Sequence, residues 1–139
     1  MDAQEYIDKI AQGRGFVLDF HKVMAKHDFD VLTATDALTR AAVLSERSLD
    51  MRTKELLFIV SLVAVRGDRN DTIAHMRGAL RIGVTPQEIL EALEILLPLA
   101  GVVLFKEGWE IWREVTEADG IEPSVNGAPA GSASASHTG

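Results

Sequence analysis

Residues 67–102 read GDRNDTIAHMRGALRIGVTPQEILEALEILLPLAGV, and this stretch contains the clearest helix boundaries of the chain. The spacing of its apolar residues predicts a helix over about residues 70–82. Gly83 suits the left-handed position that follows a helix, and apolar Val84 comes next, as in a Schellman motif. The sequence TPQE at residues 85–88 then predicts the next helix start, because it combines a capping box with an early proline.

Helical periodicity continues on both sides of this stretch. Apolar residues at helical spacing indicate helices around residues 16–24 and 31–41. Asp50 is a candidate N-cap for a third helix that runs to Val65, and this helix is apolar on every side, which is typical of a buried central element. The β-branched residues in it also suit a strand, but its length and the absence of other strand signals favour a helix.

Downstream of the quoted stretch, one more helix is predicted. Pro98 and Gly101 break or kink the fifth helix. The last helix then carries four large side chains on its inward face: Phe105, Trp109, Trp112 and Val115. Nothing in the sequence alternates with a period of two. We therefore predict an all-α bundle of about six helices.

Length and composition indicate one domain. The chain has 139 residues, of which 47% are hydrophobic and 25% charged, which is ordinary for a globular protein and leaves room for one core. Residues 120–139 are rich in Gly, Ala, Ser and Pro and have little apolar surface, which is typical of a disordered segment. We predict a helical domain over residues 1–119, followed by a disordered tail over residues 120–139.

Charge and hydropathy exclude several partners. The formal net charge of −7 disfavours binding to a nucleic-acid backbone, which requires a basic surface. The longest apolar stretch, Leu56 to Val65, is about half the ~20 residues that a membrane helix needs, so we expect no membrane span. The N-terminus lacks the basic and apolar regions of a signal peptide, and we expect a cytoplasmic protein.

Three polar residues in the quoted stretch are candidates for chemistry. Asp68, Asp71 and His75 share one face of a helix, and a carboxylate near an imidazole can fix its tautomer and favour acid/base catalysis. Alternatively, the two aspartates stabilise the helix N-terminus and His75 is a packed or exposed neighbour. An Asp-Asp-His metal site is less supported, because the sequence offers no recognisable fourth ligand. We predict no metal.

The quoted stretch resembles the carboxymuconolactone decarboxylase family, within the alkylhydroperoxidase D-like superfamily of helical oligomers. The resemblance covers roughly residues 50–115. Its most specific parts are the motif of His75, Arg77, Gly78 and Ala79 and the turn at residues 83–88. It implies a homotrimer or homohexamer that removes carbon dioxide from a small carboxylated unsaturated lactone without a metal or organic cofactor.

The superfamily has a redox branch that uses a glutamate, a Cys-x-x-Cys pair and a histidine. Counting back from His75, the cysteine positions of that motif are occupied by Asp68 and Asp71. The chain has no cysteine, so it lacks the thiols of a peroxidase and we exclude that activity. It is closer to the decarboxylase branch, although Asn70 stands where those enzymes often have a histidine.

The resemblance also implies roles for individual residues. His75 is the candidate catalytic acid or base, and Asp71 would orient it. The family glutamate falls on Leu56, and Glu55 is one residue out of frame, a rotation of about 100° on a helix. We nevertheless include Glu55 as a catalytic candidate, in which case residues 66–67 would absorb the shift.

The substrate-binding candidates are Arg77, Asp68 and Arg69, with Arg52 a weaker cation candidate. Arg77 leaves the helix on a different side from His75, so an arginine at a subunit interface or in solvent is an equal alternative. The aromatic residues of the last helix could line a lactone pocket, but their spacing is more typical of a core or a subunit interface.

Three functions remain open on the sequence. The first is a cofactor-independent carboxy-lyase-like enzyme that acts on a small carboxylated lactone or related ring compound. The second is a non-catalytic oligomeric binding protein of the same fold. The third is another acid/base enzyme, such as an isomerase or hydrolase, that uses the same pocket.

Overall fold

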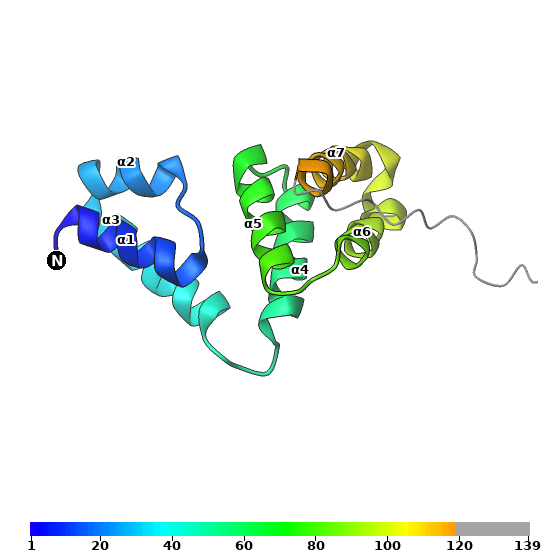
Figure 1. Ribbon diagram of the computed structural model, residues 1–139. Coiled ribbons are helices and arrows are strands. Elements are labelled where there is room, and N and C mark those ends of the chain that lie inside the picture. The colour runs from blue at the N-terminus through cyan, green and yellow to red at the C-terminus, as the bar shows by residue number, and fades with distance from the viewer. Residues whose placement is uncertain (119–139) are drawn as a thin grey trace, which may run out of the picture.

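A computed structural model describes residues 1–118, and in this part of the chain all regular structure is helical, with no strand. The all-α prediction is therefore confirmed, with more helices than the six expected (Figure 1). The predicted tail, residues 120–139, lies outside the described residues. The elements are α1 (Ala3–Arg14), α2 (Asp19–His27), α3 (Phe29–Thr39), a π-helical turn η1 (Arg40–Leu44), α4 (Met51–Ala64), α5 (Arg69–Arg81), α6 (Pro86–Glu94) and α7 (Leu96–Ala118).

The helices form two groups, α1–α3 and α4–α7, which η1 and residues 45–50 connect (Figure 1). Each group has its own cluster of buried apolar side chains. The larger cluster belongs to α4–α7 and the segment between α5 and α6. The smaller one contains Tyr6, Ile10, Ala25 and Leu32 from α1–α3. Chain length predicts a single core, whereas the structure has two apolar clusters. The reason is that the N-terminal helices pack mainly on one another.

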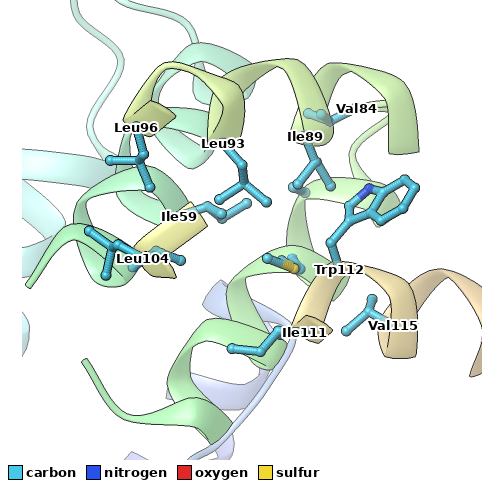
Figure 2. Packing of buried hydrophobic residues seen from close by; sticks show 12 residues of the cluster. Ile59, Val84, Ile89, Leu93, Leu96, Leu104, Ile111, Trp112 and Val115 are labelled. Atoms are coloured by element: carbon cyan, nitrogen blue, oxygen red, sulfur yellow. The ribbon is translucent and has the colours of Figure 1, made fainter. Parts of the chain in front are cut away.

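The α4–α7 core packs aliphatic side chains together with Trp112 (Figure 2). Trp112 is buried, and its Nε1–H donates to the Pro86 carbonyl at 2.8 Å, so α7 is tied to the start of α6. Gly108 permits the close packing of α7, because a Cβ there would lie 3.0 Å from the side chains of Val63 and Leu93. These contacts hold α7 against α4 and α6. The packing of α4 on α5 completes the group.

The predicted helix boundaries around α5 and α6 are confirmed. Gly83 has φ +93°, and the Val84 and Gly83 amides donate to the carbonyls of Ala79 and Leu80, which is the Schellman pattern. Thr85 and Glu88 form the predicted capping box at the start of α6. Asp50 caps α4, accepting from the Thr53 amide at 2.7 Å.

The N-terminal group differs from the sequence predictions. Helix α1 was not predicted, although Asp2 and Glu5 form a capping box at its start. The helices around residues 16–24 and 31–41 are present as α2 and α3, but several of the apolar residues that indicated them are exposed. Phe20, Val23, Val31 and Leu38 are at least half exposed, whereas α2 buries His21 and Ala25 and α3 buries Leu32 and Asp36.

The second half of α7 was predicted to belong to the core or to a subunit interface. Its Ile111, Trp112 and Val115 side chains are buried in the chain's own core. Exposed apolar side chains lie earlier in α7, at Leu99 and Val103, which are 80% and 73% exposed. The homotrimer or homohexamer remains a prediction. No helix within residues 1–118 is long and apolar enough to cross a membrane.

Two glycine substitutions test the α5–α6 boundary. Gly83→Ala should lower the free energy of unfolding by about 1–2 kcal/mol, because alanine disfavours the left-handed conformation. Gly13→Ala, on helix α1, is the matched control, since nothing lies within 4 Å of its added Cβ. It should raise stability by about 0.5–1 kcal/mol. Urea unfolding measures both, and a neutral Gly83→Ala would contradict the left-handed cap.

Candidate active site

A cavity of about 440 Å³ lies between the two helix groups. Its α4–α5 side includes Glu55, Phe58, Asp71 and His75, and its α1–α3 side includes Arg14, His21 and Asp36. A volume of this size suits a small organic ligand. Titratable side chains from both sides therefore face the same cavity.

His75 and Glu55 contact each other at the α4–α5 side of this cavity. His75 Nδ1 lies 3.0 Å from Glu55 Oε2, and the two side chains are 15% and 11% exposed. A carboxylate can only accept here, so Nδ1 carries a proton and Nε2 is the nitrogen left for proton exchange with a ligand. The pair has the geometry of a histidine oriented by a carboxylate.

The one-residue frame shift of Glu55 does not keep it from His75. Helix α4 ends at Ala64, and the connection to α5 contains Arg66 at φ +53°, a left-handed conformation. Gly67 follows, and a Cβ there would lie 2.9 Å from Leu62 Cδ2, so the chain turns tightly against α4. Leu56, which occupies the family glutamate position, packs against the apolar core instead.

Two aromatic rings enclose the His75 imidazole. Phe58 stacks on it with ring centroids 4.1 Å apart and planes 19° apart. Phe16, from the segment between α1 and α2, meets it edge-on at 5.3 Å. These rings reduce the access of water to His75, which strengthens its electrostatic interaction with Glu55.

Asp71 lines the cavity, one helical turn before His75 on α5. Burial raises the pKa of the Asp71 carboxyl, and the charge of Asp68 raises it further, against an opposing effect of His75. Asp68 itself is the N-cap of α5, where its carboxylate accepts from the amides of Asn70 and Asp71. The hydrogen-bonded carboxylate partner of His75 is thus Glu55, rather than the expected Asp71.

The predicted substrate-binding residues do not line the cavity. Asp68 is engaged at the helix start, and Arg69 forms an ion pair with Glu114 on α7 at an exposed position. Arg77 is exposed on α5, away from the cavity-lining side of that helix. Asp71, His75 and Glu55 are brought together, and the three substrate-binding candidates are not.

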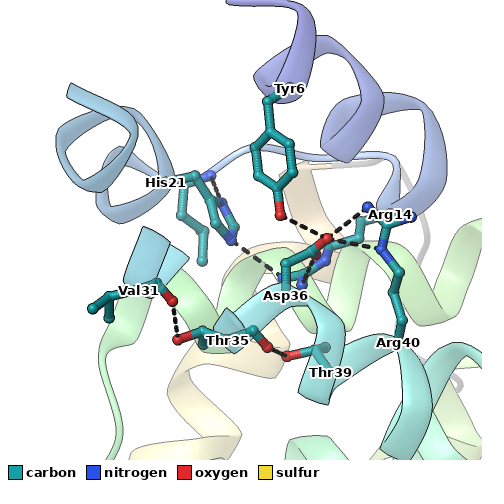
Figure 3. A network of polar contacts seen from close by, with 9 residues as sticks. Tyr6, Arg14, His21, Val31, Thr35, Asp36, Thr39 and Arg40 are labelled. Carbon is teal, nitrogen blue, oxygen red and sulfur yellow. Dashed lines mark hydrogen bonds and ion pairs between the residues drawn. The ribbon is translucent and has the colours of Figure 1, made fainter. Parts of the chain in front are cut away.

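Sequence reasoning missed the α1–α3 side of the cavity, which contains a buried polar network (Figure 3). Asp36 is 3% exposed and accepts from the Tyr6 hydroxyl at 2.9 Å, from Arg14 Nη2 at 2.6 Å, and from Arg40. Burial raises the pKa of Asp36, but the hydrogen bonds from Arg40 and Tyr6 and the two arginine charges outweigh it and hold that pKa below its usual value. His21 lies beside Arg14 in the same network.

One signal could have located this network. That signal is the spacing of Asp36 and Arg40, an acidic and a basic residue one helical turn apart. The apolar residues Val31 and Leu38, in contrast, lie on the exposed side of α3. The contacts of Asp36 with Tyr6 and Arg14 span 30 and 22 residues, and no local pattern encodes them. Within residues 1–118, no group of three or more side chains could hold a metal ion.

His21 should make stability depend on pH. Burial lowers the pKa of His21 from its usual 6.5, and the charge of Arg14 lowers it further, against an opposing effect of Asp36. The unfolded chain therefore takes up a proton at a higher pH than the folded one. Stability should be full above pH 6.5 and fall as the pH drops through 6.5 toward the folded pKa.

Urea unfolding between pH 5 and 8 measures this effect. His21→Gln, which can still accept from the Leu18 amide, should reduce the loss of stability toward pH 5. His27→Gln changes an exposed histidine on the same helix and should leave it unchanged. An equal loss in wild type and His21→Gln would show that His21 is not held neutral in the folded state.

Comparison with known protein families gives a match that covers most of the described helices. Residues 30–114, which include α4, α5, α6 and therefore Glu55, Asp71 and His75, match the model of the carboxymuconolactone decarboxylase family. No curated protein and no solved structure matches the chain significantly. The family match spans more than half of the chain and includes the His75–Glu55 pair, so the protein belongs to the carboxymuconolactone decarboxylase family.

Proposed function

We propose that this protein is a cofactor-independent carboxy-lyase-like enzyme that acts on a small carboxylated lactone or related ring compound. The observation that carries the proposal is the 3.0 Å contact between His75 and Glu55 inside a cavity of about 440 Å³. Family membership supports the reaction type, and the cavity supports a small ligand. In this proposal the side chains of the protein bind the ligand directly, without a cofactor.

The reaction needs one proton and a place for one electron pair. When the bond between the ring and its carboxylate breaks, carbon dioxide leaves and the electron pair delocalises onto the lactone carbonyl. A proton must then reach a carbon of the resulting dienolate. His75 supplies it from Nε2, while the contact of Nδ1 with Glu55 holds the ring in the orientation for the transfer. The proton lost to the product is regained from water, so the overall reaction exchanges carboxylate for hydrogen.

The aromatic rings around His75 contribute to this role. Phe58 and Phe16 fix the plane of the imidazole from its face and its edge. A fixed ring aims Nε2 in one direction, so proton transfer does not require reorientation of the donor. The same low-dielectric surroundings strengthen the contact between His75 Nδ1 and the Glu55 carboxylate.

A second candidate is an isomerase that moves a proton within a small ring compound. The observation that favours it is Asp71, a second carboxyl group in the same cavity whose pKa burial raises. An acid and a base in one cavity can protonate one carbon of a ligand while deprotonating another. Release of carbon dioxide distinguishes the two candidates.

Substitution of His75 tests both candidates. Against a panel of carboxylated lactones, His75→Ala should reduce turnover by about 10²–10⁴-fold, the usual contribution of a general acid or base. Glu55→Gln should cost less, because the proton carrier remains, and Asp71→Asn should cost least in carbon dioxide release. Carbon dioxide evolution and the pH–rate profile are the measurements, and the limb due to His75 should be missing in His75→Ala.

The matched control is His27→Ala, because His27 is an exposed histidine at the end of α2 and away from the cavity. It should keep full turnover. Circular dichroism should show that all four variants remain folded. A fully active His75→Ala would end the catalytic role of this residue, and a protein that binds the panel without turning it over would favour the non-catalytic alternative.

A further inference from the structure

The α1–α3 side of the cavity contains a cation that the proposed mechanism does not use. Arg14 is the last residue of α1, its side chain is 15% exposed, and it lines the same cavity as His75. Among the cavity-lining side chains of residues 1–118, Arg14 alone has a permanent positive charge. The α4–α5 side, in contrast, carries the carboxyl groups of Glu55 and Asp71. The cavity is therefore polarised from one side to the other.

The charge of Arg14 is only partly neutralised. Its ion-pair partner Asp36 also pairs with Arg40, so two arginines share one carboxylate and the group keeps a net charge of +1 (Figure 3). Both oxygens of Asp36 already accept hydrogen bonds, one from Arg14 and the other from Tyr6 and Arg40. Asp36 holds Arg14 in position and leaves positive potential at the cavity wall.

The contact between Arg14 and His21 lacks an acceptor. His21 Nδ1 accepts from the Leu18 amide at 3.0 Å, so the proton of the neutral ring is on Nε2. That Nε2 lies 3.2 Å from Arg14 Nη1, which can only donate. Arg14 Nε is buried and has no protein partner in the described structure. Two N–H groups thus converge at the cavity wall, and a third is unsatisfied close by.

An anionic oxygen is the group that would satisfy these donors. A carboxylate has two oxygens and up to four acceptor directions, which suits a guanidinium together with an imidazole N–H. Burial and the Arg14 charge lower the pKa of His21, which keeps its ring neutral and its Nε2–H available as a donor. A carboxylate on the opposite side of the cavity would instead lie near Glu55 and Asp71, which repel it.

We propose that Arg14 and His21 form an anion subsite that binds the carboxylate of the small ring ligand and directs the rest of the ring toward His75. The carboxylated ligand rests on the function proposed above, while the subsite itself rests on Arg14, His21 and Asp36. It serves a lyase and an isomerase alike, since it orients the ligand and leaves proton transfer to His75. Both residues precede residues 30–114, so the family match does not assign them.

Binding of two matched probes tests the subsite on the full chain without requiring turnover. The probes are 2-furoate, a five-membered oxygen ring with a carboxylate, and 2-furamide, its neutral counterpart of similar shape. Titration calorimetry gives the affinities, and the NMR signals of the His21 and His75 rings report where each probe binds. The wild type should bind 2-furoate at least about tenfold more tightly than 2-furamide, and 2-furoate should shift the His21 signal.

Arg14→Gln should lower the affinity for 2-furoate at least about tenfold and leave that for 2-furamide unchanged. Because this variant removes one partner of buried Asp36, the double variant Arg14→Gln, Asp36→Asn is made as well and should show the same loss. Arg77→Gln is the matched control, since Arg77 is an exposed arginine that does not line the cavity. It should bind both probes as the wild type does.

Three results would overturn the subsite: equal wild-type affinities for the two probes, 2-furoate affinity unchanged in folded Arg14→Gln and in the double variant, or a loss confined to Arg77→Gln. These readouts are independent of catalysis. Charge-dependent binding at Arg14 without carbon dioxide release would refute the lyase and keep the subsite. Turnover that survives in Arg14→Gln, together with unchanged 2-furoate affinity, would refute the subsite and keep the lyase.

Discussion

The packing of α4 against α5 is the contact on which the candidate site depends. A short, tight connection joins the two helices, with Arg66 in a left-handed conformation and Gly67 against Leu62. This hairpin brings Glu55 to His75 across a separation of 20 residues. Burial of Ile59 and Met76 in the common core then fixes both helices, so the His75–Glu55 distance is set by apolar packing. The hydrogen bond between His75 and Glu55 therefore forms between side chains that packing has already positioned.

A second constraint orders the α1–α3 group. Its apolar cluster has four buried members, which is a small core for three helices. Asp36 adds a buried network that connects α1 and α3 through Tyr6, Arg14 and Arg40. A buried carboxylate loses its hydration, so it is tolerated only in the geometry that keeps all its partners. We infer that this network fixes the position of α1 relative to α3 more than it contributes net stability.

The sequence predicted what local rules encode. The Schellman motif at Gly83 and the capping box of Thr85 and Glu88 appear as expected, because each depends on residues within one turn of the chain. The apolar spacing that predicted α2 and α3 does not show which side of α3 is buried, because Val31 and Leu38 are exposed and Asp36 is buried. What buries Asp36 is a set of partners up to 30 residues away.

The same distinction applies to the site. Asp71 and His75 were recognised because they lie one turn apart on one helix, and proximity in sequence suggested that they pair. The structure gives His75 a partner from α4 instead, since its Nδ1 lies against Glu55. Arg14 and His21 had no local motif at all. Their relation to His75 exists only once two helix groups with separate cores face each other across the cavity.

This arrangement separates two tasks within one small chain. The residues suited to proton transfer, His75 and Glu55, lie in the segment that the family shares, whereas Arg14 and His21 lie before it. An acid/base pair needs a fixed distance and orientation, which the large α4–α7 core supplies. Recognition of an anionic group needs a buried cation with an unsatisfied donor, which the Asp36 network supplies. Changes at Arg14 or His21 therefore alter recognition of the anionic group without replacing either member of the proton-transfer pair, whereas Phe16, which contacts His75, links the two parts.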